Sequence, residues 1–229
     1  MHYLKLAGAL LGALFGLALT AVSASALTLP DVSIVLGGSY PLHLQGEVTT
    51  VRTTLGSASG VTFEGKGASL LLLAKELSAL GTFSFVFKEV GIPGGAKCKT
   101  GTEPAGTVVL TGEYHVVPLN LTGTLAILFL ISFLELACET AKIKIRGKVL
   151  ATILKAGEEA TQLTELGLDV EGVNGRQNVT SYYNDGGTLV DTNLESDAGL
   201  EFVNADENIA GEIVLTVLGS QMIQITGRL

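Results

Sequence analysis

Apolar and polar residues alternate along most of the chain, and this period of two constrains the fold more than any other feature. Residues 107–116 show it, with apolar residues or glycine at the even positions and mostly polar residues between them. The same alternation occurs at 82–88, 142–149 and 165–171. Successive side chains of a β-strand point to opposite faces of its sheet, so the pattern predicts strands with one buried face. Further candidate strands, separated by turn residues, are 32–36, 47–54, 60–65, 177–183, 188–194, 198–203, 209–218 and 220–226.

Two segments depart from this alternation. Residues 69–80 (SLLLLAKELSAL) fit either a short helix or a buried strand. Residues 125–136 (LAILFLISFLEL) are too few to span a membrane as a helix and fit a central strand buried on both faces. The whole pattern predicts an all-β fold, an antiparallel sandwich or barrel of roughly ten or more short strands. The chain has no Trp, so an outer-membrane barrel with aromatic girdles is disfavoured.

The first 26 residues have the features of a secretory signal peptide. Lys5 precedes an apolar run at 6–19, and Ala24-Ser25-Ala26 provides the small residues of a cleavage site. A retained membrane anchor is the alternative, but a spanning helix needs about 20 apolar residues. We therefore expect a signal peptide at 1–26 and a single β-rich domain at 27–229. The expected location is secreted or extracellular, with no membrane span in the mature chain.

The chain has two cysteines, too few for a disulfide-rich miniprotein or a cysteine-rich zinc site. Cys98 lies in a loop rich in Gly and Lys, and Cys138 ends an apolar run. Export to an oxidising compartment favours one disulfide between Cys98 and Cys138. In the chain-entropy model, closing a loop of about 40 residues stabilises the fold by roughly 4 kcal/mol. A reactive thiol is the alternative, but no histidine is near either cysteine in the sequence.

Charge divides the mature chain into two unequal parts. Residues 27–156 carry 11 Lys or Arg and nine Asp or Glu. Residues 157–229 carry two Arg and 13 Asp or Glu. This asymmetry fits an acidic C-terminal subdomain from about residue 157, an ion site, or two halves that face each other. The net charge of −8 and a pI near 4.9 argue against a general nucleic-acid binder, so we expect no nucleic-acid partner.

Opposite charges on successive strands predict a hairpin about Ala156-Gly157. Four cations alternate on the first strand, and acidic residues alternate on the next. Antiparallel pairing would place Lys148 opposite Glu165, Lys144 opposite Asp169 and Lys142 opposite Glu171. A type II′ turn that begins at Gly157 would shift this register.

No motif predicts catalysis or cofactor binding. There is no G-x-S-x-G elbow, and the mature chain has two histidines, His43 and His115, which would share a metal only if the fold brought them together. Carboxylates are abundant after residue 157, but no glycosidase-like pair stands out. The turn at 182–187 (YYNDGG) fits either a strand end or a surface recognition site. We expect no catalytic residue and no cofactor.

Calcium is the one metal for which the sequence has a candidate. Oxygen-bearing residues gather around Asp206, and a second group contains Glu195, Asp197 and Glu201. Calcium prefers six to eight oxygen ligands, but neither group has the EF-hand spacing. Charged turns and strand edges that keep the chain soluble are the alternative interpretation.

The order of several segments is a further feature of the chain. A leader is followed by GVTFEG, a cysteine in a Gly/Lys/Thr loop, GTVVLTGEYHVV, a long apolar segment ending at Cys138, KIKIRGKVL and YYNDGG. This order resembles that of secreted bacterial β-rich proteins with no assigned activity. The resemblance implies a secreted β-rich fold over most of the mature chain and assigns no functional residue.

Three functions compete. The leader, the strand pattern and the single expected disulfide favour a secreted or cell-surface structural or interaction module, with a protein or cell-surface partner and no catalytic activity. Aliphatic segments such as 70–73 and 125–134 also allow a carrier of an apolar small molecule in a barrel or between sheets. A polymer hydrolase is the third hypothesis and would need a cleft with paired carboxylates or a Ser/His pair.

Overall fold

The computed structural model consists of strands, turns and loops in the part of the chain that it describes. The described residues are 31–36, 40–57, 62–74, 80–120, 124–139, 141–154, 159–163, 165–169, 172–173, 176–177, 179–184, 186–192, 194–196, 201–204, 212–217 and 222–226. Within them the predicted all-β, antiparallel class is confirmed. These residues include no helix that is long and apolar enough to cross a membrane. The predicted signal peptide at 1–26 lies outside them.

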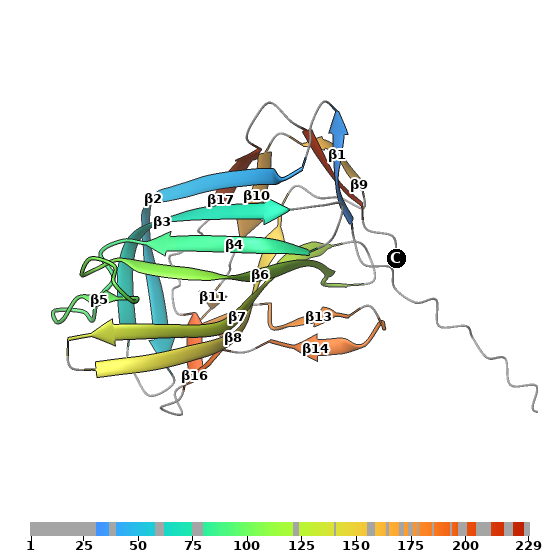
Figure 1. Ribbon diagram of the computed structural model, residues 1–229. Helices are drawn as coiled ribbons and strands as arrows, with labels where there is room; N and C mark the ends of the chain where they lie inside the picture. Colours follow the sequence, from blue (N-terminus) through green and yellow to red (C-terminus); the bar gives the residue numbers. More distant parts are fainter. Residues whose placement is uncertain are drawn as a thin grey trace, which may run out of the picture.

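Six long strands form the main part of the fold (Figure 1). They are β2 (Leu42–Ser57), β3 (Thr62–Ala74), β4 (Leu80–Phe87), β6 (Val108–Pro118), β7 (Leu125–Cys138) and β8 (Ala141–Ile153). The shorter strands are β1 (Asp31–Leu36), β5 (Cys98–Lys99), β9 (Glu159–Leu163), β10 (Glu165–Asp169), β11 (Gly172–Val173), β12 (Arg176–Gln177), β13 (Ser181–Tyr183), β14 (Leu189–Asp191), β15 (Leu194–Ser196), β16 (Glu201–Asn204), β17 (Glu212–Val217) and β18 (Met222–Thr226). Of the ambiguous segment 69–80, residues 69–74 are strand and 75–79 lie outside the described residues.

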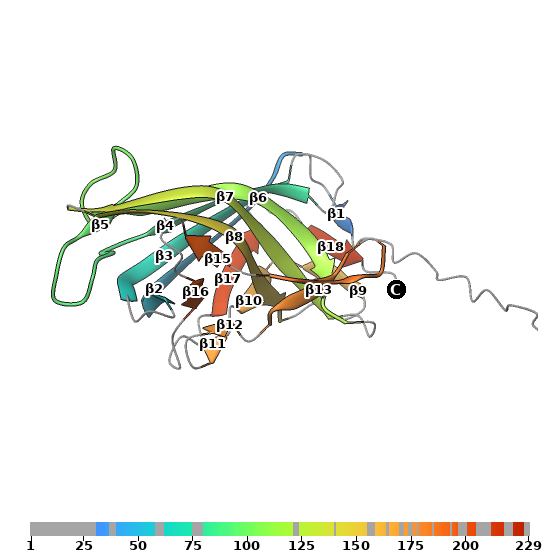
Figure 2. The same cartoon turned by 90° about the horizontal axis from the view of Figure 1, so that it is seen from below.

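The six long strands curl into a half-barrel in the order β2-β3-β4-β6-β7-β8, each antiparallel to its neighbour (Figure 2). Two pairs of short strands connect its outer strands. The pair β10–β17 joins the end of β8 to the start of β2, and the pair β15–β16 joins the middle of β8 to the end of β2. Strands from the acidic C-terminal part therefore belong to the same sheet as the long strands.

Three smaller sheets accompany this one. They have the strand orders β1-β18-β9, β11-β12 and β13-β14. The last is a hairpin whose turn is held by Asn184, because its side-chain Oδ1 accepts a hydrogen bond from the backbone N–H of Thr188 at 2.9 Å. The YYNDGG segment thus combines a strand end with a tight turn.

The inner face of the half-barrel is the main hydrophobic core. Along each strand, every second side chain points inside. The antiparallel registers bring these side chains opposite one another on neighbouring strands, as in the pairs Leu72–Phe83 and Val116–Ile127. The core residues are Leu42, Leu44, Leu70, Leu72, Ala74, Phe83, Phe85, Leu110, Tyr114, Val116, Leu125, Ile127, Phe129, Ile131, Ala151, Ile153 and Leu168. Burial, with a smaller contribution from Tyr40, raises the pKa of Tyr114 to about 12.

Aromatic rings fill the centre of this core. The rings of Phe83, Phe85 and Phe129 meet edge to face, with centroids 4.9 to 5.9 Å apart. Two glycines make room for neighbouring rings. A Cβ on Gly81 would lie 2.5 Å from both the Tyr114 ring and a backbone oxygen, and one on Gly112 would lie 2.8 Å from the Phe83 ring.

The outer face carries a second core beneath the β13–β14 hairpin. Val117, Ala126, Leu128 and Leu150 point outward from the long strands, and Tyr182 of β13 packs on them. The first five residues of β7 are consequently buried on both faces, as the apolar run at 125–136 predicted. Beyond them β7 becomes exposed at Ser132 and Phe133.

A long arm connects β4 to β6 and is fixed by the predicted disulfide, Cys98–Cys138. Both cysteines are buried, and Cys98 pairs with Cys138 across β5 and β7. Backbone hydrogen bonds of 2.8 Å also join Gly91 of the arm to Glu64 of β3 in both directions. The disulfide therefore ties the arm to the end of β7 at a site that solvent does not reach.

The hairpin register predicted from opposite charges is wrong. Strands β8 and β10 do pair antiparallel, but Asp169 lies opposite Thr152 and Lys144 lies opposite Glu135 of β7. Glu165 lies opposite Thr216 of β17, whereas Glu171 and the expected turn at 156–157 lie outside the described residues.

In the observed register, apolar side chains lie opposite each other instead of the predicted charges. This register places Leu168 opposite Ile153, and both side chains are in the main core. Burying two such side chains contributes about 1.5–3 kcal/mol each, whereas a cross-strand charge pair contributes roughly 0.2–1 kcal/mol. In addition, β9 lies between β8 and β10 in the chain and pairs with β18, so a two-residue turn does not connect them.

We expect Gly81→Ala and Gly112→Ala each to lower the free energy of unfolding by about 1–3 kcal/mol, because the added methyl group would overlap backbone and a packed ring. Gly95→Ala is the matched control, since its Cβ would meet nothing closer than 3.6 Å and the expected change is within about 0.5 kcal/mol. Urea unfolding followed by circular dichroism measures all three. Equal stability of all three variants would contradict the packing described here.

Replacing both cysteines, as Cys98→Ala with Cys138→Ala, should lower the free energy of unfolding by about 2–5 kcal/mol. The native disulfide closes a separation of 40 residues, so its loss increases the conformational entropy of the unfolded chain. Urea unfolding of the double variant and of the oxidised parent protein tests this, and unchanged stability would contradict it.

Candidate functional site

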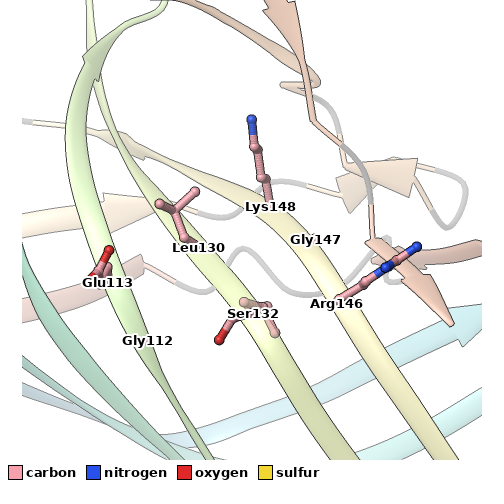
Figure 3. Close-up of a pocket in the computed structure, with 8 residues that line it drawn as sticks. Gly112, Glu113, Leu130, Ser132, Arg146, Gly147 and Lys148 are labelled. Carbon is pink, nitrogen blue, oxygen red and sulfur yellow. The ribbon is translucent and has the colours of Figure 1, made fainter.

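An open hollow lies where β6 and β7 separate beside β8 (Figure 3). Its volume is about 570 Å³, and it is lined by Gly112, Glu113, Leu130, Ile131, Ser132, Arg146, Gly147 and Lys148. Glu113, Ser132 and Arg146 are exposed, so the hollow opens to solvent. Small-molecule sites typically occupy about 300–1,000 Å³, and this hollow falls within that range.

A β-bulge in β7 shapes one side of the hollow. Ile131 lies opposite Gly147 and Leu134 opposite Ile145, so two residues of β7, Ser132 and Phe133, occupy the space opposite one residue of β8. Both are exposed, and 57% of the Phe133 surface is accessible to solvent. A bulge of this kind redirects side chains, and bulges are frequent next to functional sites. Here it presents a hydroxyl group and an aromatic ring to solvent.

A row of three residues crosses the hollow on the outer face. Glu113 of β6 lies opposite Leu130 of β7, which in turn lies opposite Lys148 of β8. Neighbouring strands are about 4.8 Å apart, so the backbones of Glu113 and Lys148 are separated by roughly 10 Å. The hollow therefore has a carboxylate on one wall, an ammonium group on the other and an apolar side chain between them.

Tyr182 of the covering hairpin holds Lys148 in place. The Lys148 ammonium donates a hydrogen bond of 3.3 Å to the Tyr182 hydroxyl and lies 5.6 Å from the centroid of its ring. A cation at this distance over an aromatic ring gains about 0.5–1 kcal/mol at an exposed site. Tyr182 is itself buried, so the border of the hollow is a fixed part of the fold.

The cations of β8 continue from the hollow along the strand. Lys142, Lys144, Arg146 and Lys148 alternate on the same face, with about 7 Å between successive residues. Lys142 pairs with Glu135 at 3.1 Å, and Lys144 lies 5.7 Å from the centroid of the Phe133 ring. Glu195 of β15 lies opposite Arg146. The ion pair with Glu135 partly balances the charge of Lys142.

His115 lies two residues beyond Glu113 on β6. Its pKa is lowered, chiefly by burial and further by repulsion from Lys148, while attraction to Glu113 opposes this shift. Glu113 and Lys148, on either side of the hollow, therefore shift the pKa of His115 in opposite directions.

The structure separates the other residues that the sequence singled out. His43 and His115 share the outer face but lie three strands apart, roughly 15 Å, too far to bind one metal ion. Asp206 and Asp197 lie outside the described residues, whereas Glu195 and Glu201 lie opposite each other in β15 and β16. Within the described ranges, no group of three or more His, Cys, Asp or Glu side chains is placed to hold a metal.

Sequence reasoning did not identify this hollow. It singled out the cations of β8 only as partners in a hairpin and Glu113 only as a neighbour of His115 on one strand face, and it passed over Leu130 and Ser132. One signal was available: polar Ser132 followed by Phe133 interrupts the apolar run of β7, which is the position of the bulge. Comparison with protein-family models, curated proteins and solved structures found no match to this chain.

We predict that Lys148→Ala raises the pKa of His115, because it removes a repelling cation, and that Glu113→Gln lowers it further. Since the folded pKa lies below the unfolded value, the stability linked to His115 is complete above pH 6.5 and decreases as the pH falls through that value. Proton NMR titration of the imidazole measures the pKa directly. Lys88→Ala, a change on an exposed lysine of the arm, is the control and should leave it unchanged.

Proposed function

We propose that the protein is a secreted or cell-surface interaction module without catalytic activity, and that it binds its partner at the outer-face hollow. The observation that carries this proposal is the concentration of exposed charged, hydroxyl and aromatic groups around the β7 bulge. All eight residues that line the hollow belong to long strands, and rigid elements position a binding site more accurately than loops do.

The packing of the inner face favours this function over a carrier of apolar molecules. A carrier needs free volume inside the barrel, but large side chains fill the described part of the inner face. The Phe83 and Phe129 rings, for example, are 4.9 Å apart at its centre. Polymer hydrolysis is less favoured, because the lining of the hollow contains one carboxylate, Glu113, and no histidine.

The disulfide and the leader support secretion. A buried disulfide that fixes a long arm suits an oxidising compartment, where disulfides form and persist. The disulfide also stabilises a single extracellular β-rich domain, because it lowers the conformational entropy of the unfolded chain.

Binding of the fluorescently labelled, secreted protein to the cells that produce it tests the proposal. We expect saturable binding that falls at least ten-fold in Arg146→Ala and in Lys148→Ala, because both cations line the hollow. Lys88→Ala and Lys97→Ala remove the same charge from the arm and should bind like the parent protein. No saturable binding, or equal binding by all four variants, would contradict the proposal.

A further inference from the structure

Strands β6 and β7 pair with each other along only part of their length. Their ladder runs from Pro118–Leu125 to Glu113–Leu130. Toward the beginning of β6 and the end of β7 the two strands diverge, and within the described residues they form no further pairs with each other. Each keeps its other neighbour there, β4 for β6 and β8 for β7. The sheet therefore has a split between β6 and β7, and the hollow lies at its closed end (Figure 3).

Strand β5 occupies the wide end of this split. On one side, Lys99 lies opposite Ala137 of β7. On the other side, the backbone N–H of Thr100 donates a hydrogen bond of 3.3 Å to the carbonyl of Thr107, and the N–H of Val109 donates one of 2.8 Å to Thr100 Oγ1. The wide end is thus two strand spacings across, roughly 10 Å, which is the room that one strand needs. Strand β5 ends before the split reaches the hollow.

On β6, backbone groups point into the split. The N–H and C=O groups of a strand residue point to the same neighbouring strand, and the side changes with each residue. The Val109 N–H points to Thr100 in the split, so the N–H and C=O of Thr111, two residues further along, also point into the split. Thr111 is exposed, and among the described residues none lies opposite it on this side.

On β7, the bulge leaves further backbone groups outside the ladder. Ile131 and Leu134 each lie opposite a residue of β8, whereas Ser132 and Phe133 share the space opposite one residue. The extra residue of a bulge does not join the ladder, so its N–H and C=O need another partner. Ser132 and Phe133 are exposed, and the Ser132 hydroxyl points toward β6 (Figure 3). Both borders of the split therefore offer polar groups to a ligand.

An extended peptide satisfies both borders together. Unpaired strand edges are templates for another strand, and its main-chain hydrogen bonds provide affinity. We infer that an extended segment of a partner protein inserts into the split between β6 and β7, in line with β5 and, like β5, antiparallel to β7. Its backbone pairs with Thr111 on one side and with Ser132 on the other. This inference rests on the proposed function and names the class of partner.

The surroundings of the split specify the side chains of this segment. Side chains that point inward lie beside Leu110 and Ile131 of the main core, so apolar residues fit there. Side chains that point outward lie between Thr111 and Ser132, and the exposed Glu113 is a diagonal neighbour within reach of a long side chain. We therefore expect apolar and polar residues to alternate, with Lys or Arg at an outward position. The cations of β8 lie on the other side of the hollow and contact the partner outside this segment.

Selection from a phage-displayed library of random heptapeptides tests the inference. We expect enriched sequences in which apolar and polar residues alternate, with Lys or Arg among the polar ones. An enriched peptide is then synthesised, and its affinity is measured by isothermal titration calorimetry. Methylation of alternate backbone nitrogens of this peptide should weaken binding about ten-fold or more, because it removes hydrogen-bond donors and keeps every side chain.

Amide hydrogen exchange followed by NMR locates the bound peptide. Exchange of the Thr111 and Ser132 amides should slow on binding, because each amide gains a partner in the inserted strand. The amide of Gly94, in the exposed part of the arm, is the control and should exchange at the same rate with and without the peptide.

Variants test the split directly. Ser132→Tyr fills it and should weaken peptide binding about ten-fold or more, whereas Thr188→Tyr places the same side chain at an exposed position beside the hairpin turn and should bind like the parent protein. Glu113→Gln should weaken binding of a peptide with an outward Lys or Arg about two- to five-fold. Circular dichroism and urea unfolding verify that each variant is folded.

Several results would overturn the inference. They are the absence of enriched peptides, equal affinity of the methylated peptide, unchanged exchange at Thr111 and Ser132, and unaltered affinity of the Ser132→Tyr variant.

The cell-binding assay separates this failure from failure of the proposed function. Saturable cell binding that depends on Arg146 and Lys148, without any enriched peptide, would overturn the peptide inference alone. Peptide binding in the split without saturable cell binding would overturn the proposed function and leave the peptide site in place.

Discussion

The need to bury one apolar face of six long strands organises this structure. A flat sheet would leave that face in water, so the strands curl and enclose it, and two pairs of short strands connect the outer strands β2 and β8. Curling brings aromatic rings against the backbone of neighbouring strands. Gly81 and Gly112 are the positions where the absence of a side chain allows this contact.

In the described part of the inner face, large side chains pack closely, and the binding surface that we propose lies on the outer face. The β13–β14 hairpin covers part of that face, and Tyr182 of β13 positions Lys148. Beyond the hairpin, the bulge in β7 turns Ser132 and Phe133 toward solvent. The first five residues of β7 therefore serve the core, and the residues around its bulge serve the candidate binding surface.

The β8 cations illustrate how local pattern and tertiary packing differ in strength. Their alternation correctly places them on one exposed face, opposite the buried Ile145. Charge predicted acidic neighbours for these cations but not the strands that carry them, because exposed ion pairs contribute little free energy and are screened by salt. Lys144 lies opposite Glu135 of β7, and between β8 and β10 the buried residues Leu168 and Ile153 lie opposite each other.

The sequence by itself determined the class of fold, most strand positions and the disulfide. Period-two alternation predicts strands with one buried face, and a chain with two cysteines has one intramolecular pairing available. Only the tertiary structure decided which strands are neighbours, where β7 bulges and that Glu113, Leu130 and Lys148 form one row. The register between two strands depends on the apolar surface that residues far apart in the chain bury together. A local sequence pattern does not specify that surface.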